Sequence, residues 1–289
     1  MAQNNTKMIA TEASRMLDSV SIPNVHYGWL AMNFAGVETN SLEVELVVED
    51  NQVQAATAVF QNFGQCTNSN CNELLVRRRN VESPPRLHYH SVPAAHYHMG
   101  DGQYLLSFFT KSAILWWLPD FQLGAPAAND PYLTLSTNPS LPLPAVTGEW
   151  RNLHPVKILK PGAFLDATIL LFCRNACHHE RLGALYSYMI AAMSDSEPGA
   201  VKKTPRAEFQ PAWDCFNGRC PAGTDPISEM KKLRQHLIER GELGILPPER
   251  GDEPSQPDPL SEMKKIRQRL IERGELGVWP PERGDGTSQ

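Results

Sequence analysis

Pairs of histidines at alternate positions are the clearest candidates for metal chemistry in this sequence. His88 and His90 flank one tyrosine, and His96 and His98 repeat this arrangement eight residues later. Residues i and i+2 of a β-strand point to the same side, so either pair can offer two imidazole nitrogens to one metal ion. A strand through either pair therefore carries the ligands with which a metal site can begin.

A second group of metal-ligand side chains follows the apolar run 167–173. It consists of Cys173, Cys177, His178 and His179. Zinc binds sulfur and imidazole nitrogen, but four ligands within one short loop do not readily enclose a tetrahedral ion. The cluster would need a histidine from residues 88–98 to complete it, and a buried Cys173 without metal is the simpler interpretation.

The cysteines of the chain occur as three close pairs: Cys66/Cys71, Cys173/Cys177 and Cys215/Cys220. For a cytosolic protein of this size we expect no disulfide framework. The spacings of four, three and four intervening residues also differ from the C-x2-C arrangement of most structural zinc sites. The cysteines therefore predict neither a disulfide scaffold nor a zinc finger.

The His-x-His motif resembles the start of the cupin metal site, which lies on a strand of a β-barrel. That pattern continues with a glutamate on the same hairpin, and no glutamate occurs between Ser91 and Gly102. The resemblance implies, as an alternative function, a metal-dependent enzyme that uses His88 and His90 or His96 and His98. The missing glutamate instead favours a protein with no metal, no cofactor and no catalytic residue.

Residues that alternate between apolar and acidic define the best strand of the sequence. Leu42, Val44, Leu46 and Val48 share one side of the segment 42–49, and three glutamates share the other. This period of two predicts a strand with one face in the core and the other in water.

Nine further segments are rich in β-branched and aromatic residues and are separated by turn signals. They span residues 27–34, 53–60, 74–78, 103–109, 113–118, 132–136, 156–159, 167–173 and 185–191. About ten short strands with no convincing helix between them predict a mainly β fold, an antiparallel jelly-roll-like β-sandwich. Residues 7–20 alone predict a helix ahead of it, from apolar side chains on one side.

The C-terminal region contains one sequence twice. Residues 225–256 read DPISEMKKLRQHLIERGELGILPPERGDEPSQ, and residues 258–289 match them at 25 of 32 positions. We name these segments repeat 1 and repeat 2. A packed core gives every residue its own environment, so a near-verbatim duplication indicates an appendage that carries one binding motif in two copies.

Each repeat has the signals of a short amphipathic helix. Asp225 or Asp258 supplies an N-cap before a first-turn proline, and Gly241 or Gly274 follows the last turn. A single helix of this length is unstable in water, so its apolar stripe must pack on something. We predict an unidentified protein partner, bound by Met230, Leu233, Leu237 and Ile238 of repeat 1 and by Met263, Ile266, Leu270, Ile271 and Trp279 of repeat 2.

A shift in composition marks the domain boundary. Residues 1–200 contain 12 Lys and Arg with 17 Asp and Glu, whereas residues 201–289 contain 15 and 15, together with 11 of the 24 prolines. We therefore divide the chain into an N-terminal arm or short helix (1–24), a β-sandwich domain (25–200), a linker (201–224) and two helical repeats (225–256 and 257–289).

Charge and hydropathy argue against two kinds of partner, nucleic acid and the membrane. The net charge of −5 argues against a surface that coats nucleic acid, and the three arginines at 77–79 predict at most a weak contact. The longest apolar stretches are too short to span a bilayer, and no secretory signal opens the sequence. These features predict a soluble protein made in a cytosol.

The segment 185–199, LYSYMIAAMSDSEPG, resembles the last jelly-roll strand of picorna-like virus capsid proteins. In that family an apolar strand leads into an acidic segment and a Gly/Pro-rich exit. The resemblance implies a structural capsid protein that assembles with other capsid subunits as a homo- or hetero-oligomer, in the virion and the host cytoplasm. An adaptor that recruits a partner through its C-terminal repeats is a further alternative.

Overall fold

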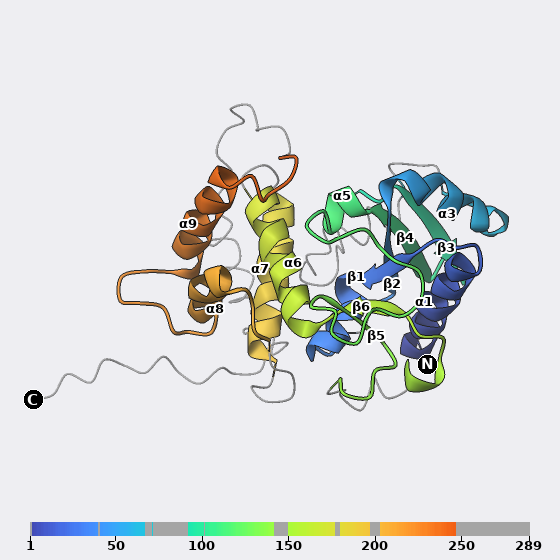
Figure 1. Ribbon diagram of the computed structural model, residues 1–289, viewed down its shortest axis with the longest axis horizontal. Helices are drawn as coiled ribbons and strands as arrows, with labels where there is room; N and C mark the ends of the chain where they lie inside the picture. The colour runs from blue at the N-terminus through green and yellow to red at the C-terminus, as the bar shows by residue number, and fades with distance from the viewer. Residues whose placement is uncertain are drawn as a thin grey trace, which may run out of the picture.

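The protein folds around one mixed β-sheet with helices on both faces (Figure 1). The computed structural model describes residues 2–39, 41–66, 71, 92–100, 102–141, 150–176, 180–196 and 203–246. The six strands are β1 (Asn24–Tyr27), β2 (Glu43–Val48), β3 (Ala95–Met99), β4 (Tyr104–Thr110), β5 (Leu133–Leu135) and β6 (Lys157–Leu159). Their order is β3-β4-β2-β1-β6-β5, which places β3 and β5 at the two edges of the sheet.

Antiparallel and parallel pairs occur together in this sheet. The pairs β1/β2, β3/β4 and β5/β6 are antiparallel, whereas β2/β4 and β1/β6 are parallel. The α-helices are α1 (Ala2–Ser19), α2 (Gly28–Ala31), α3 (Val53–Val59), α5 (Lys111–Ile114), α6 (Pro161–Asn175), α7 (Glu180–Asp195), α8 (Gln210–Phe216) and α9 (Pro226–Glu239). Short 3-10 helices lie at Met32–Ala35, Asp50–Gln52, Gln61–Phe63 and Ala207–Phe209.

Two hydrophobic clusters lie on the two faces of the sheet. The first joins α1 and α3 to the sheet face that carries Val44 and Leu46. The second joins α6, α7, α8 and α9 to the opposite face, where Tyr27 stacks on Phe164 of α6 at 5.1 Å between ring centroids. In Figure 1 these four helices extend away from the sheet as a helical layer of their own.

The predicted antiparallel jelly-roll sandwich is wrong, because the described residues form a single mixed sheet covered by helices. The decisive segments are 167–173 and 185–191, which lie in α6 and α7 rather than in strands. Nearly every residue of α6 after its first turn is buried. A helix that is apolar on all sides has no period of 3.6 to distinguish it from a buried strand.

The alternation over residues 42–49 identifies β2 correctly but not its surroundings. Val44, Leu46 and Val48 face one cluster as predicted, and Leu42 lies outside the strand. The other face is not in water, because Glu43 and Glu45 are 7% and 6% exposed. The Glu45 carboxylate accepts a hydrogen bond from the Trp29 backbone N–H at 3.1 Å, so α2 covers this face and supplies a polar partner.

Of the other predicted helices and strands, some are confirmed and others are wrong. The helix at 7–20 is confirmed by α1, and the strands at 103–109, 132–136 and 156–159 contain β4, β5 and β6. The segments 53–60 and 113–118 are wrong as strands, since they contain α3 and the end of α5. The segment 27–34 begins as β1 but continues as α2, and 74–78 lies outside the described residues.

The segments at the ends of the predicted sandwich are also part of the core. Ala10, Ala13 and Leu17 of α1 are buried in the first cluster. The span 201–224 is not a bare linker, because α8 places Trp213 in the second cluster. Among the helices that the structure describes, none combines the length and hydropathy needed to cross a membrane.

A buried histidine in β1 predicts a loss of stability in acid. His26 has no exposed surface, its Nδ1 donates to the Glu45 carbonyl at 2.9 Å, and burial lowers its pKa from 6.5 to about 4. The unfolded chain therefore takes up this proton first, so the contribution is complete above pH 6.5 and is lost as the pH falls to about 4. We expect a loss of about 3 kcal/mol of unfolding free energy over this window.

The measurement is urea unfolding at several pH values for the wild type and for His26→Asn, which keeps a donor near Glu45 but cannot titrate. The variant should be less stable at pH 7 and show a flatter dependence between pH 6.5 and 4. Equal slopes in the two proteins would show that His26 does not cause the acid sensitivity.

Candidate metal centre

Strand β3 aligns two histidines on one side of the sheet edge. His96 and His98 alternate with Tyr97, whose side chain is fully buried in the first cluster on the opposite face. The two imidazole rings are 5.4 Å apart between centroids and lie at 75° to each other. Pairing with Ser107 and Leu105 of β4 fixes the backbone of both histidines, so their spacing is set by the sheet.

A short extended segment brings Cys66 beside this strand. Gln65 forms an antiparallel bridge with Tyr97, and the Cys66 backbone N–H donates to the His96 carbonyl at 3.1 Å. Gly64 turns the chain from the preceding 3-10 helix into this bridge with a φ of +71°, a conformation that glycine adopts without strain. The backbone of residues 64–66 thus delivers one sulfur to the histidine pair.

Cys71 supplies the fourth side chain. It is 6% exposed, packs with the buried Leu105 of β4, and its Sγ lies 3.3 Å from His98 Nε2. One ligand atom from each of Cys66, Cys71, His96 and His98 lies within 4.8 Å of every other. Cys71 and His96 are buried and the other two are half-buried, so the cluster is largely shielded from water.

This arrangement fits a tetrahedral zinc ion. Bonds of about 2.3 Å to sulfur and about 2.1 Å to nitrogen place ligand atoms about 3.4–3.8 Å apart. The observed limit of 4.8 Å needs only small side-chain rotations to reach that geometry. Two thiolates with two imidazoles are a ligand set typical of structural zinc sites.

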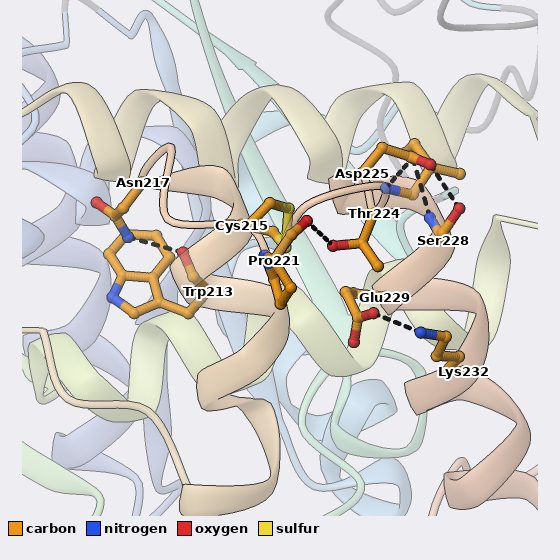
Figure 2. Close-up of a disulfide and its surroundings, with 11 residues drawn as sticks. Trp213, Cys215, Asn217, Pro221, Thr224, Asp225, Ser228, Glu229 and Lys232 are labelled. Atoms are coloured by element: carbon orange, nitrogen blue, oxygen red, sulfur yellow. Dashed lines mark hydrogen bonds and ion pairs between the residues drawn. A yellow bond between two sulfur atoms is a disulfide. The ribbon is translucent and has the colours of Figure 1, made fainter.

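The two cysteine pairs with the same spacing have different states. Cys215 and Cys220 form a disulfide at the end of α8, a single bond that the sequence did not predict (Figure 2). Cys66 and Cys71 form no disulfide with each other. The difference follows from the neighbours, since the 66/71 pair faces two histidines across the sheet edge.

The sequence indicated two of the four side chains of this cluster, and only for the alternative function. His96 and His98 were candidates as a pair, but Cys66 and Cys71 were not joined to them. The signal was present as two cysteines separated by four intervening residues, followed 25 residues later by His-x-His. It was missed because a C-x4-C spacing is uncommon in zinc sites and the two pairs are far apart in the chain.

The other predicted metal candidates do not form a described site. His88 and His90 lie outside the described residues, as do residues 177–179. Cys173 is fully buried in α6, with its Sγ 3.9 Å from the Met230 carbonyl of α9. Within the described residues the four-residue cluster at β3 is the group of metal-ligand side chains that the fold brings together.

The predicted partner-binding stripe of repeat 1 packs on the protein itself. Met230 and Leu237 are fully buried, Leu233 is 8% exposed, and Ile238 is half-buried against the second cluster. Repeat 1 is therefore part of the fold and not a lightly tethered appendage. The residues predicted for repeat 2 lie outside the described residues: Met263, Ile266, Leu270, Ile271 and Trp279.

Comparisons with known proteins add no assignment to this geometry. No family model, curated protein or solved structure matches the chain. The cluster at β3 and the repeats are therefore the features from which a function can be inferred.

Proposed function

We propose that this protein is a non-enzymatic zinc-binding protein whose metal ion fastens the segment around Cys66 and Cys71 to the edge strand β3. The observation that carries the proposal is the approach of two thiols and two imidazoles to within 4.8 Å. This replaces the expectation of a protein without a metal.

The number of protein ligands favours a structural role for the ion. Catalytic zinc keeps one coordination position for water or substrate, whereas structural zinc has four protein ligands. Cys66, Cys71, His96 and His98 fill all four positions of a tetrahedron. The ion would therefore stabilise the fold and would not activate water.

The position of the cluster explains what the ion would hold together. β3 lies at the edge of the sheet, where unpaired backbone groups invite pairing with another chain. Residues 64–66 cover part of that edge through one bridge and one backbone hydrogen bond. Such a short pairing is weak by itself, so bonds from zinc to both strands of the pair would secure it.

The test is metal analysis of the full-length protein purified under reducing conditions without chelator. We expect one zinc per chain, and cobalt in its place should give the visible absorption bands of tetrahedral sulfur and nitrogen coordination. Cys66→Ser and His98→Gln should each abolish the bands. Protein that holds no zinc after incubation with the metal, with its thiols reduced, would contradict the proposal.

Two matched variants control for general effects of losing a thiol or an imidazole. Cys173→Ala removes a buried thiol from α6, and His236→Gln removes an exposed imidazole from α9. Both proteins should keep one zinc and the same cobalt spectrum as the wild type. Loss of the spectrum in either control would show that the bands do not report on the cluster at β3.

The structure bears on the architecture that each predicted function implies, and the functions themselves stay predictions. The cupin-like enzyme required a β-barrel, and the mixed sheet with helices on both faces excludes that architecture for the described residues. The capsid function stays a prediction, although the segment 185–195 that carried the resemblance is helical in α7. The adaptor function depends on the repeats.

A further inference from the structure

Repeat 1 is held by an extended contact surface on the helical layer. The apolar residues Met230, Leu233 and Leu237 of α9 belong to the cluster formed with α6 and α8. The helix is capped by Asp225, whose side chain accepts hydrogen bonds from the backbone N–H groups of Ile227 and Ser228 at 2.9 and 3.1 Å (Figure 2). The stripe of α9 thus occupies a specific surface, here named the α9 contact surface.

The residues after α9 add polar and steric contacts to this surface. Trp116 Nε1 donates to the Glu242 carbonyl at 2.9 Å, and Arg240 pairs with Glu208 at 3.2 Å. A Cβ atom at Gly244 would lie 2.9 Å from Cδ1 of Trp116, so glycine is required for this close approach. Leu243 is buried in the same cluster.

Repeat 2 preserves the residues that make these contacts. Its identical equivalents are Met263, Leu270, Arg273, Glu275, Leu276 and Gly277. The one difference at a buried position replaces Leu233 by its isomer Ile266. The other differences from the described part of repeat 1 fall at positions 227, 236, 245 and 246, which are exposed or half-buried.

We propose that repeat 2 competes with repeat 1 of the same molecule for the α9 contact surface. The chain contains two nearly identical segments, and among the described residues one surface holds the first of them. Either repeat can dock, and the other is then released with its apolar stripe available to a partner. This proposal does not depend on the zinc centre.

The connecting chain is long enough for the exchange. α9 is about 21 Å long, and the 19 residues between Glu239 and Pro259 can span about 60 Å. Repeat 2 can therefore place its first turn where repeat 1 begins. The chain between α8 and a docked repeat 2 is roughly four times as long as the chain between α8 and a docked repeat 1. The larger entropic cost of closing this longer loop favours docking of repeat 1 by roughly tenfold, so the state with repeat 2 docked should be a minor one.

The test is a cycle of substitutions in the full-length protein. Leu237→Asp places a charge at a fully buried position of repeat 1, which without replacement would lower the folding equilibrium constant by about a thousandfold. Because repeat 2 can dock in place of repeat 1, we expect the folding equilibrium constant of the single variant to fall only about tenfold. Leu270→Asp alone should leave the folding equilibrium constant unchanged, and the double variant should show the full loss of about a thousandfold.

Two results would overturn the exchange. One is a loss for Leu237→Asp as large as that of the double variant, since repeat 2 would then not fit the surface. The other is a folded Leu237→Asp protein that is dimeric by light scattering, because the surface would then be filled by a second molecule. Lys232→Asp, at an exposed position of α9, is the matched control and should leave the equilibrium within about threefold of the wild type.

Hydrogen exchange identifies the docked repeat directly. In the wild type, backbone amides of residues 226–239 should be protected more strongly than those of 259–272. In Leu237→Asp the order should reverse, with protection of 259–272 gained and that of 226–239 lost. Unchanged exchange in residues 259–272 of this variant would contradict the proposal even if the protein remains folded.

Discussion

Cys71→Ser is expected to abolish the stabilisation of the protein by zinc. In the wild type, zinc at about a thousandfold above its dissociation constant should add about 4 kcal/mol to the unfolding free energy. For a protein of this size that is about 8–16 °C in the melting temperature. The buried serine at position 71 cannot replace a thiolate, so melting with zinc and melting with chelator should coincide.

The informative quantity is the difference between the two melting temperatures of each protein. Cys173→Ala should lower both values to the same extent and preserve the difference, because Cys173 is not among the four ligands and packs in α6 with its Sγ 3.9 Å from the Met230 carbonyl of α9. A Cys71→Ser protein that zinc still stabilises by more than a few degrees would show that the ion binds elsewhere in the chain.

Gly28→Ala is expected to be among the most damaging single-methyl additions in the described part of the chain. Gly28 joins β1 to α2 with a φ of +81°, and an added Cβ would lie 1.2 Å from Oε2 of Glu45. The clash would displace the carboxylate from the Trp29 backbone N–H and leave both groups buried without that hydrogen bond. With the backbone strain, we expect a loss of about 3–5 kcal/mol.

Gly124→Ala separates the two causes of this loss. Gly124 has a similar φ of +75°, lies in an exposed loop, and has no atom within 4 Å of an added Cβ. This control should cost only the backbone strain, about 1 kcal/mol. Equal losses in the two variants, measured by urea unfolding, would show that the contact with Glu45 contributes nothing.

Local signals were sufficient where the interactions are local. The helix of repeat 1 begins at Pro226 after the Asp225 cap and ends before Gly241, which has a φ of +68°, as the sequence predicted. A cap and a C-terminal glycine involve residues only a few positions apart, so the chain can specify them without the rest of the fold. The apolar side of β2 follows from the same kind of local period.

Sequence periodicity failed to identify the secondary structure where burial on all sides removes the alternation of apolar and polar residues. The run 167–173 is apolar on every side because α6 is packed between the sheet and the other helices of its layer. The glutamates of β2 indicated a solvated face, but Glu45 is buried because the Trp29 N–H meets it there. Partners from distant segments decide such cases, and a single segment carries no record of them.

The sequence by itself determined the pairing of His96 with His98 and the helix of repeat 1, and the tertiary structure decided what each of them meets. His96 and His98 share a side because strands alternate, but Cys66 reaches them only through the bridge between Gln65 and Tyr97. The stripe of α9 exists because of helical spacing, but its burial against α6 and α8 required the helical layer to form. Contacts between residues distant in sequence depend on chain topology, which side-chain periodicity does not encode.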